Sequence, residues 1–156
     1  MKKQTFLNIK KDELLQAVKD CWLSLWSIKG ILYREKKGID HRTSVMGVLV
    51  QAMIPAEASG VVFTASPTGK DDGLIWINAG YGLGEGVVSG RVNSDVYRVD
   101  KKTLEIVYKE IRKKDTAFYP SSAGIEERPI SAEVAEKAVL SDEEIKKLAG
   151  LSLNVE

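Results

Sequence analysis

The protein has 156 residues, with 23 Lys and Arg against 22 Asp and Glu, so its formal net charge is 23 − 22 = +1. A composition with 44% hydrophobic and 29% charged residues is that of a soluble globular protein and argues against disorder and collagen-like repeats. The longest run without a charge, Thr43 to Ala56, is shorter than the roughly 18 residues that span a bilayer, so we expect no membrane as a partner. The balanced charge, with no concentrated basic stripe, likewise argues against nucleic acid.

The chain has one cysteine and one histidine. Because Cys21 cannot form an internal disulfide, a reducing cytoplasm is the simplest location. The single His41 excludes a zinc site built from several His and Cys ligands. We expect Cys21 in a helix core and His41 on the surface, with neither acting in catalysis.

The first predicted element is one long helix over about residues 12–36. Apolar residues recur there every three or four positions, as on the buried stripe of an amphipathic helix. Asp12 is a candidate N-cap, and Lys36, Lys37 and Gly38 are typical of a helix end. Trp22, Trp26 and Tyr33 widen the apolar face, which predicts packing against a broad surface.

A mainly antiparallel sheet is predicted over about residues 44–111. Its strands are expected at 44–54, where an apolar β-branched run suits burial on both faces, and at 60–66, 74–81, 95–99 and 104–111. A turn at 67–73 would join the second strand to the third. Residues 112–129 lack periodicity and are predicted to be loop.

Two short helices are expected near 132–137 and 142–148, within a loop and helix region over about residues 112–150. Ser131 and Ser141 are candidate N-caps, and Glu144 stands three residues after Ser141, which is the spacing of a capping box. The predicted fold class is α+β, a single domain with a mainly antiparallel sheet flanked by helices.

Glycines alternate in the string Gly80-Tyr-Gly-Leu-Gly-Glu-Gly86. Successive N–H groups of such a loop can form an anion-binding concavity, while the alternative is a tight crossing where small residues relieve crowding. The spacing matches neither the Walker A nor the dinucleotide pattern. Glu85 is expected either to bind a metal or, with fewer assumptions, to hold the loop by accepting backbone N–H bonds.

Two further polar residues have competing interpretations. Gln51 ends an apolar strand, where its amide either caps neighbouring backbone groups or, together with the backbone of Ala52 and Met53, contacts a heterocycle such as adenine. Asp95 near the start of a strand is more typical of a turn than of a ligand.

The ordered strings VLVQAMI, ASGVVFTASPTG and GYGLGEGVVSGRVNSDVYRV closely resemble the ATP-binding domain of phosphoenolpyruvate synthases and pyruvate phosphate dikinases. The upstream TFLNI, CWLSLW and ILYRE and the downstream PISAEVAEKAVLSDEEIKKLAG extend the resemblance over nearly the whole chain. The resemblance implies an ATP-grasp fold, in which two α+β lobes hold ATP with Mg between them. It places Gln51 and Met53 beside the adenine, and Gly82, Gly84 and Glu85 at the nucleotide cleft or its wall.

The resemblance also implies that parts of the family's machinery lie outside these residues. The phosphate-binding Lys and the Arg of a Ser-Val-Arg-Ser-Ser string come before the matched region. The Ile-Glu-Trp and Leu-Gln-Ala-Arg-Pro strings, the phosphohistidine domain and the pyruvate-binding barrel come after it. Because phosphoryl transfer depends on charge neutralisation by metal, Lys and Arg, we expect the chain alone not to convert ATP, pyruvate and water to phosphoenolpyruvate, AMP and phosphate.

Three functions therefore compete. The first is a partial nucleotide-binding domain that works with the remainder of a parent enzyme or with a second copy of the chain. The second is a non-catalytic binding or scaffold module that retains the fold. The third is a fragment of a rifamycin-type drug phosphotransferase, which shares the ATP-binding domain. A lobe of a larger domain should leave apolar surface uncovered, as on the Trp22, Trp26 and Tyr33 face.

Overall fold

The computed structural model describes residues 5–66, 69, 73–122 and 124–156. The chain divides into two compact units, Met1–Ile54 and Pro55–Glu156, and each is described by itself. The predicted turn at 67–73 falls largely outside the described residues.

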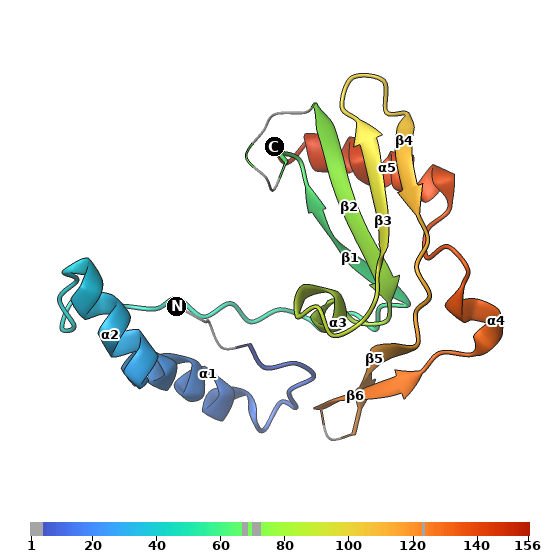
Figure 1. The fold of residues 1–156 in the computed structure, drawn as a ribbon. Helices are drawn as coiled ribbons and strands as arrows, with labels where there is room; N and C mark the ends of the chain where they lie inside the picture. Colours follow the sequence, from blue (N-terminus) through green and yellow to red (C-terminus); the bar gives the residue numbers. More distant parts are fainter. Residues whose placement is uncertain (1–4, 67–68, 70–72, 123) are drawn as a thin grey trace. The chain divides into compact units, whose positions relative to one another are not determined.

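The first unit is helical, and its predicted long helix is interrupted. Helix α1 covers Leu14–Leu23, a single 3-10 turn covers Ser24–Trp26, and helix α2 covers Ile28–Lys37 (Figure 1). The continuous helix was a wrong prediction, because Ser27 adopts an extended conformation and its hydroxyl caps α2 by accepting the Gly30 N–H. The predicted end is confirmed, since Gly38 takes a left-handed conformation with a φ of 65°. The N-cap of α1 is Glu13 rather than Asp12.

Residues 44–54 do not form the predicted strand. They have no regular secondary structure, and Val45 and Leu49 are 92% and 85% exposed. An apolar β-branched run favours a strand only where another strand can pair with it, and the described part of this unit offers none. The sheet therefore begins at residue 58 instead of about residue 44.

The second unit is built on a four-stranded antiparallel sheet with the order β1-β2-β3-β4. Its strands are β1 Ala58–Phe63, β2 Leu74–Tyr81, β3 Asp95–Asp100 and β4 Ile106–Glu110. Short helix α3, Gly84–Val88, follows β2. The α+β prediction, with a mainly antiparallel sheet flanked by helices, is confirmed.

Residues 112–129 contain a second, two-stranded sheet where a loop was predicted. Strand β5, Thr116–Ser121, pairs antiparallel with β6, Gly124–Pro129. The loop prediction was wrong because β6 is mostly polar and β5 contains Pro120, so neither strand shows the usual apolar alternation. This hairpin matters for the glycine-rich string, which it contacts through Phe118.

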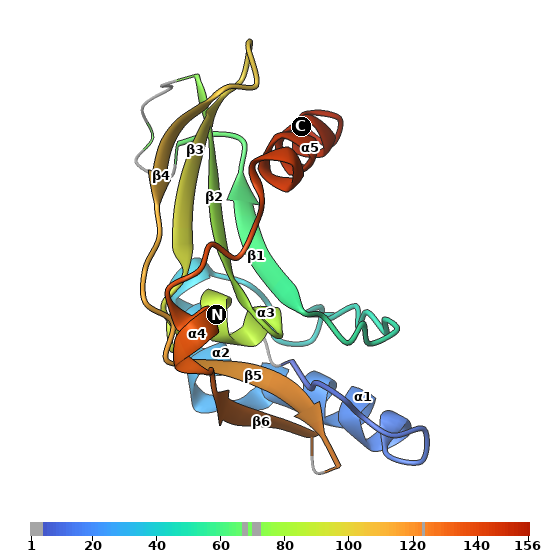
Figure 2. The same ribbon diagram turned by 90° about the vertical axis from the view of Figure 1, so that its right-hand side faces the viewer.

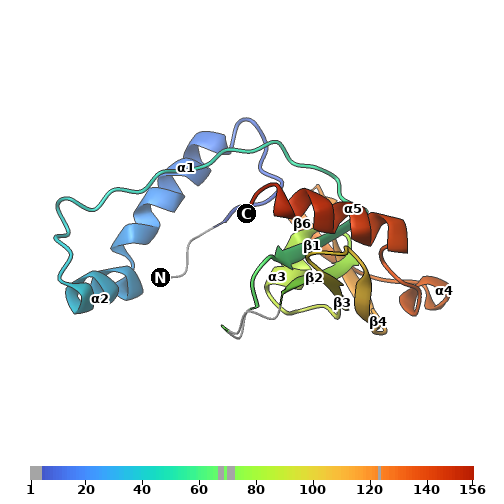
Figure 3. The ribbon, with the colours of Figure 1, turned by 90° about the horizontal axis from the view of Figure 1, so that it is seen from above.

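Helices α4, Ala132–Ala135, and α5, Asp142–Leu153, complete the unit. Helix α5 lies behind the strands in Figure 1 and along one side of the sheet in Figures 2 and 3. Every second residue of β2 and β3 faces it, and the core consists of Ile75, Ile77, Ala79, Tyr97, Val99, Ile145 and Ala149. The capping box at Ser141 and Glu144 is confirmed, while Ser131 takes the N-cap position of α4 without a side-chain bond.

Candidate functional site

The glycine segment, residues 80–86, runs from the end of β2 into α3. Its backbone is held by the chain itself: the Gly82 N–H donates to the Glu57 carbonyl and the Leu83 N–H donates to the Phe118 carbonyl, each at 2.8 Å. Gly82 has a φ of 72°, a left-handed conformation that favours glycine. Two N–H groups that an anion-binding concavity would need are therefore already bonded.

The space around the glycines supports the packing alternative at three of the four alternating positions. A Cβ on Gly82 would lie 2.3 Å from the Phe118 carbonyl oxygen, and one on Gly80 would lie 2.8 Å from a Val87 methyl. A Cβ on Gly86 would lie 2.9 Å from the Phe118 ring. Gly84 differs, because its closest neighbours are Ser59 atoms at 3.8 Å, an ordinary contact distance.

The side chains of Ser59 and Glu85, both next to Gly84, make no hydrogen bond within the described part of the chain. The Ser59 hydroxyl oxygen is buried without a hydrogen-bond partner. Glu85 is half-buried in the first turn of α3, and within the described part of the chain its carboxylate accepts no hydrogen bond. Glu85 therefore does not hold the loop through backbone N–H bonds as expected. Gly84, Glu85 and the neighbouring Ser59 are thus the groups around this segment whose space or hydrogen-bonding atoms the fold leaves unused.

The predicted adenine residues belong to the other unit. Gln51 is exposed and Met53 is half-buried, both in the irregular segment that replaces the predicted strand. The Gln51 amide is thus not the core group expected at a strand end. Because Gln51 and Gly82 lie in different units, a joint site for them stays a prediction.

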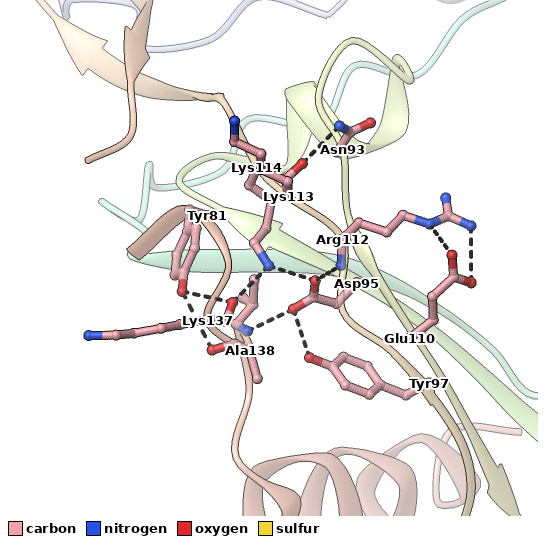
Figure 4. Close-up of polar contacts among 11 residues, drawn as sticks. Tyr81, Asn93, Asp95, Tyr97, Glu110, Arg112, Lys113, Lys114, Lys137 and Ala138 are labelled. Carbon is pink, nitrogen blue, oxygen red and sulfur yellow. Dashed lines mark hydrogen bonds and ion pairs between the residues drawn. The ribbon is translucent and has the colours of Figure 1, made fainter. Parts of the chain in front are cut away.

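The most connected polar group of the second unit is Asp95 at the start of β3 (Figure 4). One carboxylate oxygen accepts bonds from Lys114 Nζ at 2.7 Å and from the Arg112 N–H at 3.0 Å. The other accepts from the Tyr97 hydroxyl at 3.0 Å and from the Val139 N–H at 2.8 Å. We call these groups the Asp95 cluster. All four bonds are made inside the protein, where a buried carboxylate needs them.

The centre of the Asp95 cluster is fully buried, and Lys114 Nζ lies 5.7 Å from the ring centroid of Tyr81 in the glycine segment. The Asp95 and Lys114 side chains both have 0% exposure, and Lys114 Nζ also donates to the Lys137 carbonyl at 2.7 Å. The Tyr81 hydroxyl lies 3.5 Å from the carbonyl oxygens of Lys137 and Ala138. Burial, followed by the negative charge of Asp95, raises the pKa of the Tyr97 hydroxyl, and burial and the same charge raise that of Tyr81.

The polar groups of this cluster already bond one another, so we assign the cluster a structural role rather than ligand binding. It connects β3 to residues 112–114 and 137–139. It therefore holds in place the carbonyl groups of Lys137 and Ala138, which the Tyr81 hydroxyl contacts. The sequence analysis did not predict this cluster, because Asp95 was expected in a turn and Lys114 in a loop. The available signal was the alternation Asp95, Tyr97, Val99, which places the carboxylate on the core face of β3.

The two single residues of the first unit also differ from expectation. His41 is half-buried, and its Nδ1 accepts a hydrogen bond from Arg34 Nε at 2.9 Å. Cys21 is half-buried rather than in a core. Arg34 is 3% exposed and also bonds the Leu25 carbonyl, which makes this a structural contact between α2 and its neighbours.

Within the described ranges, no three side chains of His, Cys, Asp or Glu come together as metal ligands. Among the same residues, no helix is both long and apolar enough to span a membrane.

Known proteins resemble this chain along its full length. It is 44% identical over 155 residues to a probable phosphoenolpyruvate synthase of Methanocaldococcus jannaschii, an alignment that covers 97% of this chain and 13% of that protein. It is 37% identical to a phosphoenolpyruvate synthase of Aeropyrum pernix, covering 98% of this chain and 22% of that protein. It is 38% identical to a rifampicin phosphotransferase of a Streptomyces species, covering 97% and 18%.

The chain thus spans less than a quarter of the length of these relatives. The family model for the pyruvate phosphate dikinase AMP/ATP-binding domain matches residues 2–156. Because this match covers nearly every residue, the chain belongs to the pyruvate phosphate dikinase AMP/ATP-binding domain family.

Proposed function

We propose that this chain is part of the ATP-binding domain of a phosphoenolpyruvate synthase-like phosphotransferase, with the ATP-grasp arrangement of two lobes around a nucleotide. The family match over residues 2–156 carries the proposal. The relatives named as a probable phosphoenolpyruvate synthase and a phosphoenolpyruvate synthase are 44% and 37% identical to this chain, and the rifampicin phosphotransferase is 38% identical. The proposal therefore rests on the nucleotide that these proteins would share, and pyruvate is the acceptor we favour. The single cysteine supports a cytoplasmic location.

Two sets of residues would contact the nucleotide. Gln51 and Met53 would lie beside the adenine, where an exposed amide can both donate to and accept from the base edge. Gly84 and Glu85 would face the nucleotide, and Gly82, which packs against Phe118, would support the wall of the site. The room at Gly84 and the unbonded carboxylate of Glu85 support this role, since neither is used by the fold.

Magnesium would enter with the nucleotide. Mg²⁺ is commonly held by substrate phosphates together with one or two carboxylates and water. Glu85 is the carboxylate we propose near it, because it has no bond to another described residue. We propose MgATP, rather than free ATP, as the ligand.

We further propose that these 156 residues do not complete the family reaction by themselves. The Lys, Arg and Gln residues that the resemblance assigns to phosphate are not among them. A coupled assay with ATP and pyruvate should show no phosphoenolpyruvate above a blank without protein. Formation of phosphoenolpyruvate that depends on both substrates would contradict this.

The apolar helix face of the first unit suggests how the chain is completed. Trp22, Trp26 and Leu32 are each half exposed or more, and Leu15 is more exposed still. We propose that the remainder of a longer parent enzyme covers this face, as the length of the relatives suggests. Light scattering that finds a stable dimer would instead assign the face to a second copy, and the retained-scaffold alternative would then gain support.

Calorimetric titration with MgATP tests the nucleotide proposal. We expect saturable heat, and a Gln51→Ala variant should bind about fivefold more weakly, because a lost hydrogen bond is worth roughly 1 kcal/mol. Gln16→Ala is the matched control, since Gln16 is an exposed glutamine on α1 that bonds Asp20. Absence of heat with the wild-type chain, or equal weakening by both variants, would contradict the proposal.

A further inference from the structure

A row of four side chains crosses the sheet on the face opposite α5. The register pairs Phe63 with Trp76, Trp76 with Arg98, and Arg98 with Tyr108, so the row takes one residue from each strand. Alternation places these residues away from Ile75, which faces the core. We call Phe63, Trp76, Arg98 and Tyr108 the cross-strand row.

The outer members of the cross-strand row are open to solvent. Phe63 is 43% exposed and Tyr108 is 40% exposed. Helix α3 packs over the Gly80 end of this face, where a Cβ on Gly80 would lie 2.8 Å from a Val87 methyl. Phe63 and Tyr108 are therefore open to a ligand from solvent, while Trp76 and Arg98 between them are half-buried.

Arg98 in the middle of the row is held by two rings. Its guanidinium carbon lies 4.0 Å from the centroid of the Trp76 ring and 4.6 Å from that of Tyr108. Cation–π contacts of this kind hold the flat faces of the guanidinium against the rings, and the terminal Nη groups, unlike Nε, are not buried. The position of the side chain is thus fixed without any use of its hydrogen-bond donors.

Those donors have no acceptor within the part of the chain that the structure describes. Arg98 makes no ion pair and no side-chain hydrogen bond there, and its Nε is buried without a partner. A guanidinium has five N–H donors, and a buried donor left without an acceptor costs about 1–3 kcal/mol. Native proteins rarely leave a buried donor without a hydrogen-bond partner.

The acids next to the row do not supply the acceptor. Glu110, on the same face, bonds Arg112 Nε at 2.8 Å and the Tyr108 hydroxyl at 2.9 Å. Asp100 accepts the backbone N–H groups of Lys102 and Thr103. Both carboxylates are thus engaged, and Arg112 offsets the charge of Glu110.

Arg91 shows what a stacked arginine looks like when its charge is satisfied. Its guanidinium lies 4.6 Å from the Phe118 ring centroid, and its Nη2 also pairs with Glu127 at 3.2 Å. The stacking matches that of Arg98 on Tyr108, but the anion is present. Arg98 has similar stacking, but among the described residues no carboxylate forms an ion pair or hydrogen bond with it, and Glu110 acts on it only through its charge.

We propose that Arg98, held between Trp76 and Tyr108, binds an oxyanion, a phosphate or a carboxylate group, on the solvent face of the sheet. The two terminal Nη groups can donate to two oxygens of either group, and these charge-assisted bonds would pair the charge of Arg98. The proposal concerns the second unit alone and does not depend on the nucleotide proposed above.

Nuclear magnetic resonance of the 15N-labelled chain tests this directly. The arginine Nε–H signals are followed during titration with sodium phosphate and, separately, sodium acetate, with sodium chloride holding the ionic strength constant. We expect a saturable shift of the Arg98 Nε–H signal. Saturation with phosphate alone would identify a phosphate site, saturation with acetate alone a carboxylate site, and saturation with both a general oxyanion site. No saturable shift with either would overturn the proposal.

Variants separate this site from general charge attraction. Arg98→Gln should weaken the binding followed through the Trp76 indole signal by about tenfold, and Tyr108→Leu by about threefold because Arg98 loses one ring. Arg91→Gln, which removes the same charge from a stacked but paired arginine, should change it less than twofold. Equal weakening by Arg98→Gln and Arg91→Gln would overturn the proposal. If Arg98→Gln fails to fold, the wild-type Nε–H titration and Tyr108→Leu decide.

Discussion

At the scale of single residues, burial separates two Lys–Asp pairs that have nearly the same geometry. Lys114 and Asp95 lie 2.7 Å apart with no exposure, while Lys109 and Asp142 lie 2.6 Å apart with side chains 35% and 66% exposed. Breaking a buried pair leaves a charge without compensation and costs about 3–5 kcal/mol, whereas an exposed pair is worth about 0–1 kcal/mol. The two pairs should therefore differ sharply in their effect on folding.

We predict that Lys114→Met lowers the free energy of unfolding by at least about 3 kcal/mol, and that Lys109→Met lowers it by less than about 1 kcal/mol. The double variant Asp95→Asn with Lys114→Met should cost less than the sum of its single variants, because neither charge is then left alone. Urea unfolding measures all of these changes. Similar losses for the two lysine variants would show that the buried pair does not organise this unit.

The Asp95–Lys114 pair and the stacking of Arg98 are contacts that the sequence alone could not predict. Alternation along β3 could place Asp95 on the core face, but nothing in the sequence pairs it with Lys114, which is 19 positions later in a segment predicted to be loop. The stacking of Arg98 on Trp76 and Tyr108 could not be predicted either, because it depends on the register of three strands. Pairings across a sheet are set by register, which local patterns do not specify.

At the scale of elements, α5 is the clearest match between sequence and structure. Its capping box bonds Ser141 and Glu144 in both directions, as the Ser-x-x-Glu spacing predicts. The backbone N–H of Ser141, and then its hydroxyl, hold the pKa of Glu144 below its ordinary value of 4.5. Because the folded pKa is the lower one, the stabilisation is present above the ordinary value and is lost as pH falls through the folded value.

We predict that Glu144→Gln destabilises the protein near neutral pH and that the difference from wild type shrinks as pH falls through the lowered pKa of Glu144. Thermal unfolding across this pH range measures the effect. Glu143→Gln is the control, because Glu143 lies in the same first turn but makes no bond to Ser141. A difference that stays constant with pH, or one equal to that of the control, would contradict the assigned role of Glu144.

Other elements show which patterns can mislead. The strand at Leu74–Tyr81 was predicted at its observed bounds, because turn residues flank an apolar run that has partners on both sides. The equally apolar residues 44–54 have no such partner and form no strand. The helical stripe of residues 14–32 continues through Ser27, so periodicity alone concealed the break that its capping hydroxyl makes.

At the scale of the whole molecule, the two units differ in how much apolar surface each buries by itself. The core of the second unit joins β2, β3 and α5. In the described part of the first unit, the only residues that are buried are Gly30 and Arg34, and neither supplies an apolar side chain. Since apolar burial is the main stabilising contribution to folding, the first unit should open more easily.

We predict that amides of α1 and α2 exchange with deuterium at least about a hundredfold faster than those of β2 and β3, a difference of about 2.7 kcal/mol in opening free energy. Hydrogen exchange followed by mass spectrometry resolves the two groups. Equal protection of α1 and β2 would mean that the first unit is stabilised by burial beyond the side chains described for it.

We propose that one nucleotide contacts Gln51 and Met53 as well as Gly84 and Glu85, with Gly82 in the wall of the site. The most direct test is a titration of the labelled chain with MgATP, following the Met53 methyl signal and the Gly84 and Glu85 amide signals together. We predict that all of them shift and saturate with a single dissociation constant. Shifts confined to one unit, different dissociation constants for the two sets, or no shift at all would contradict the claim.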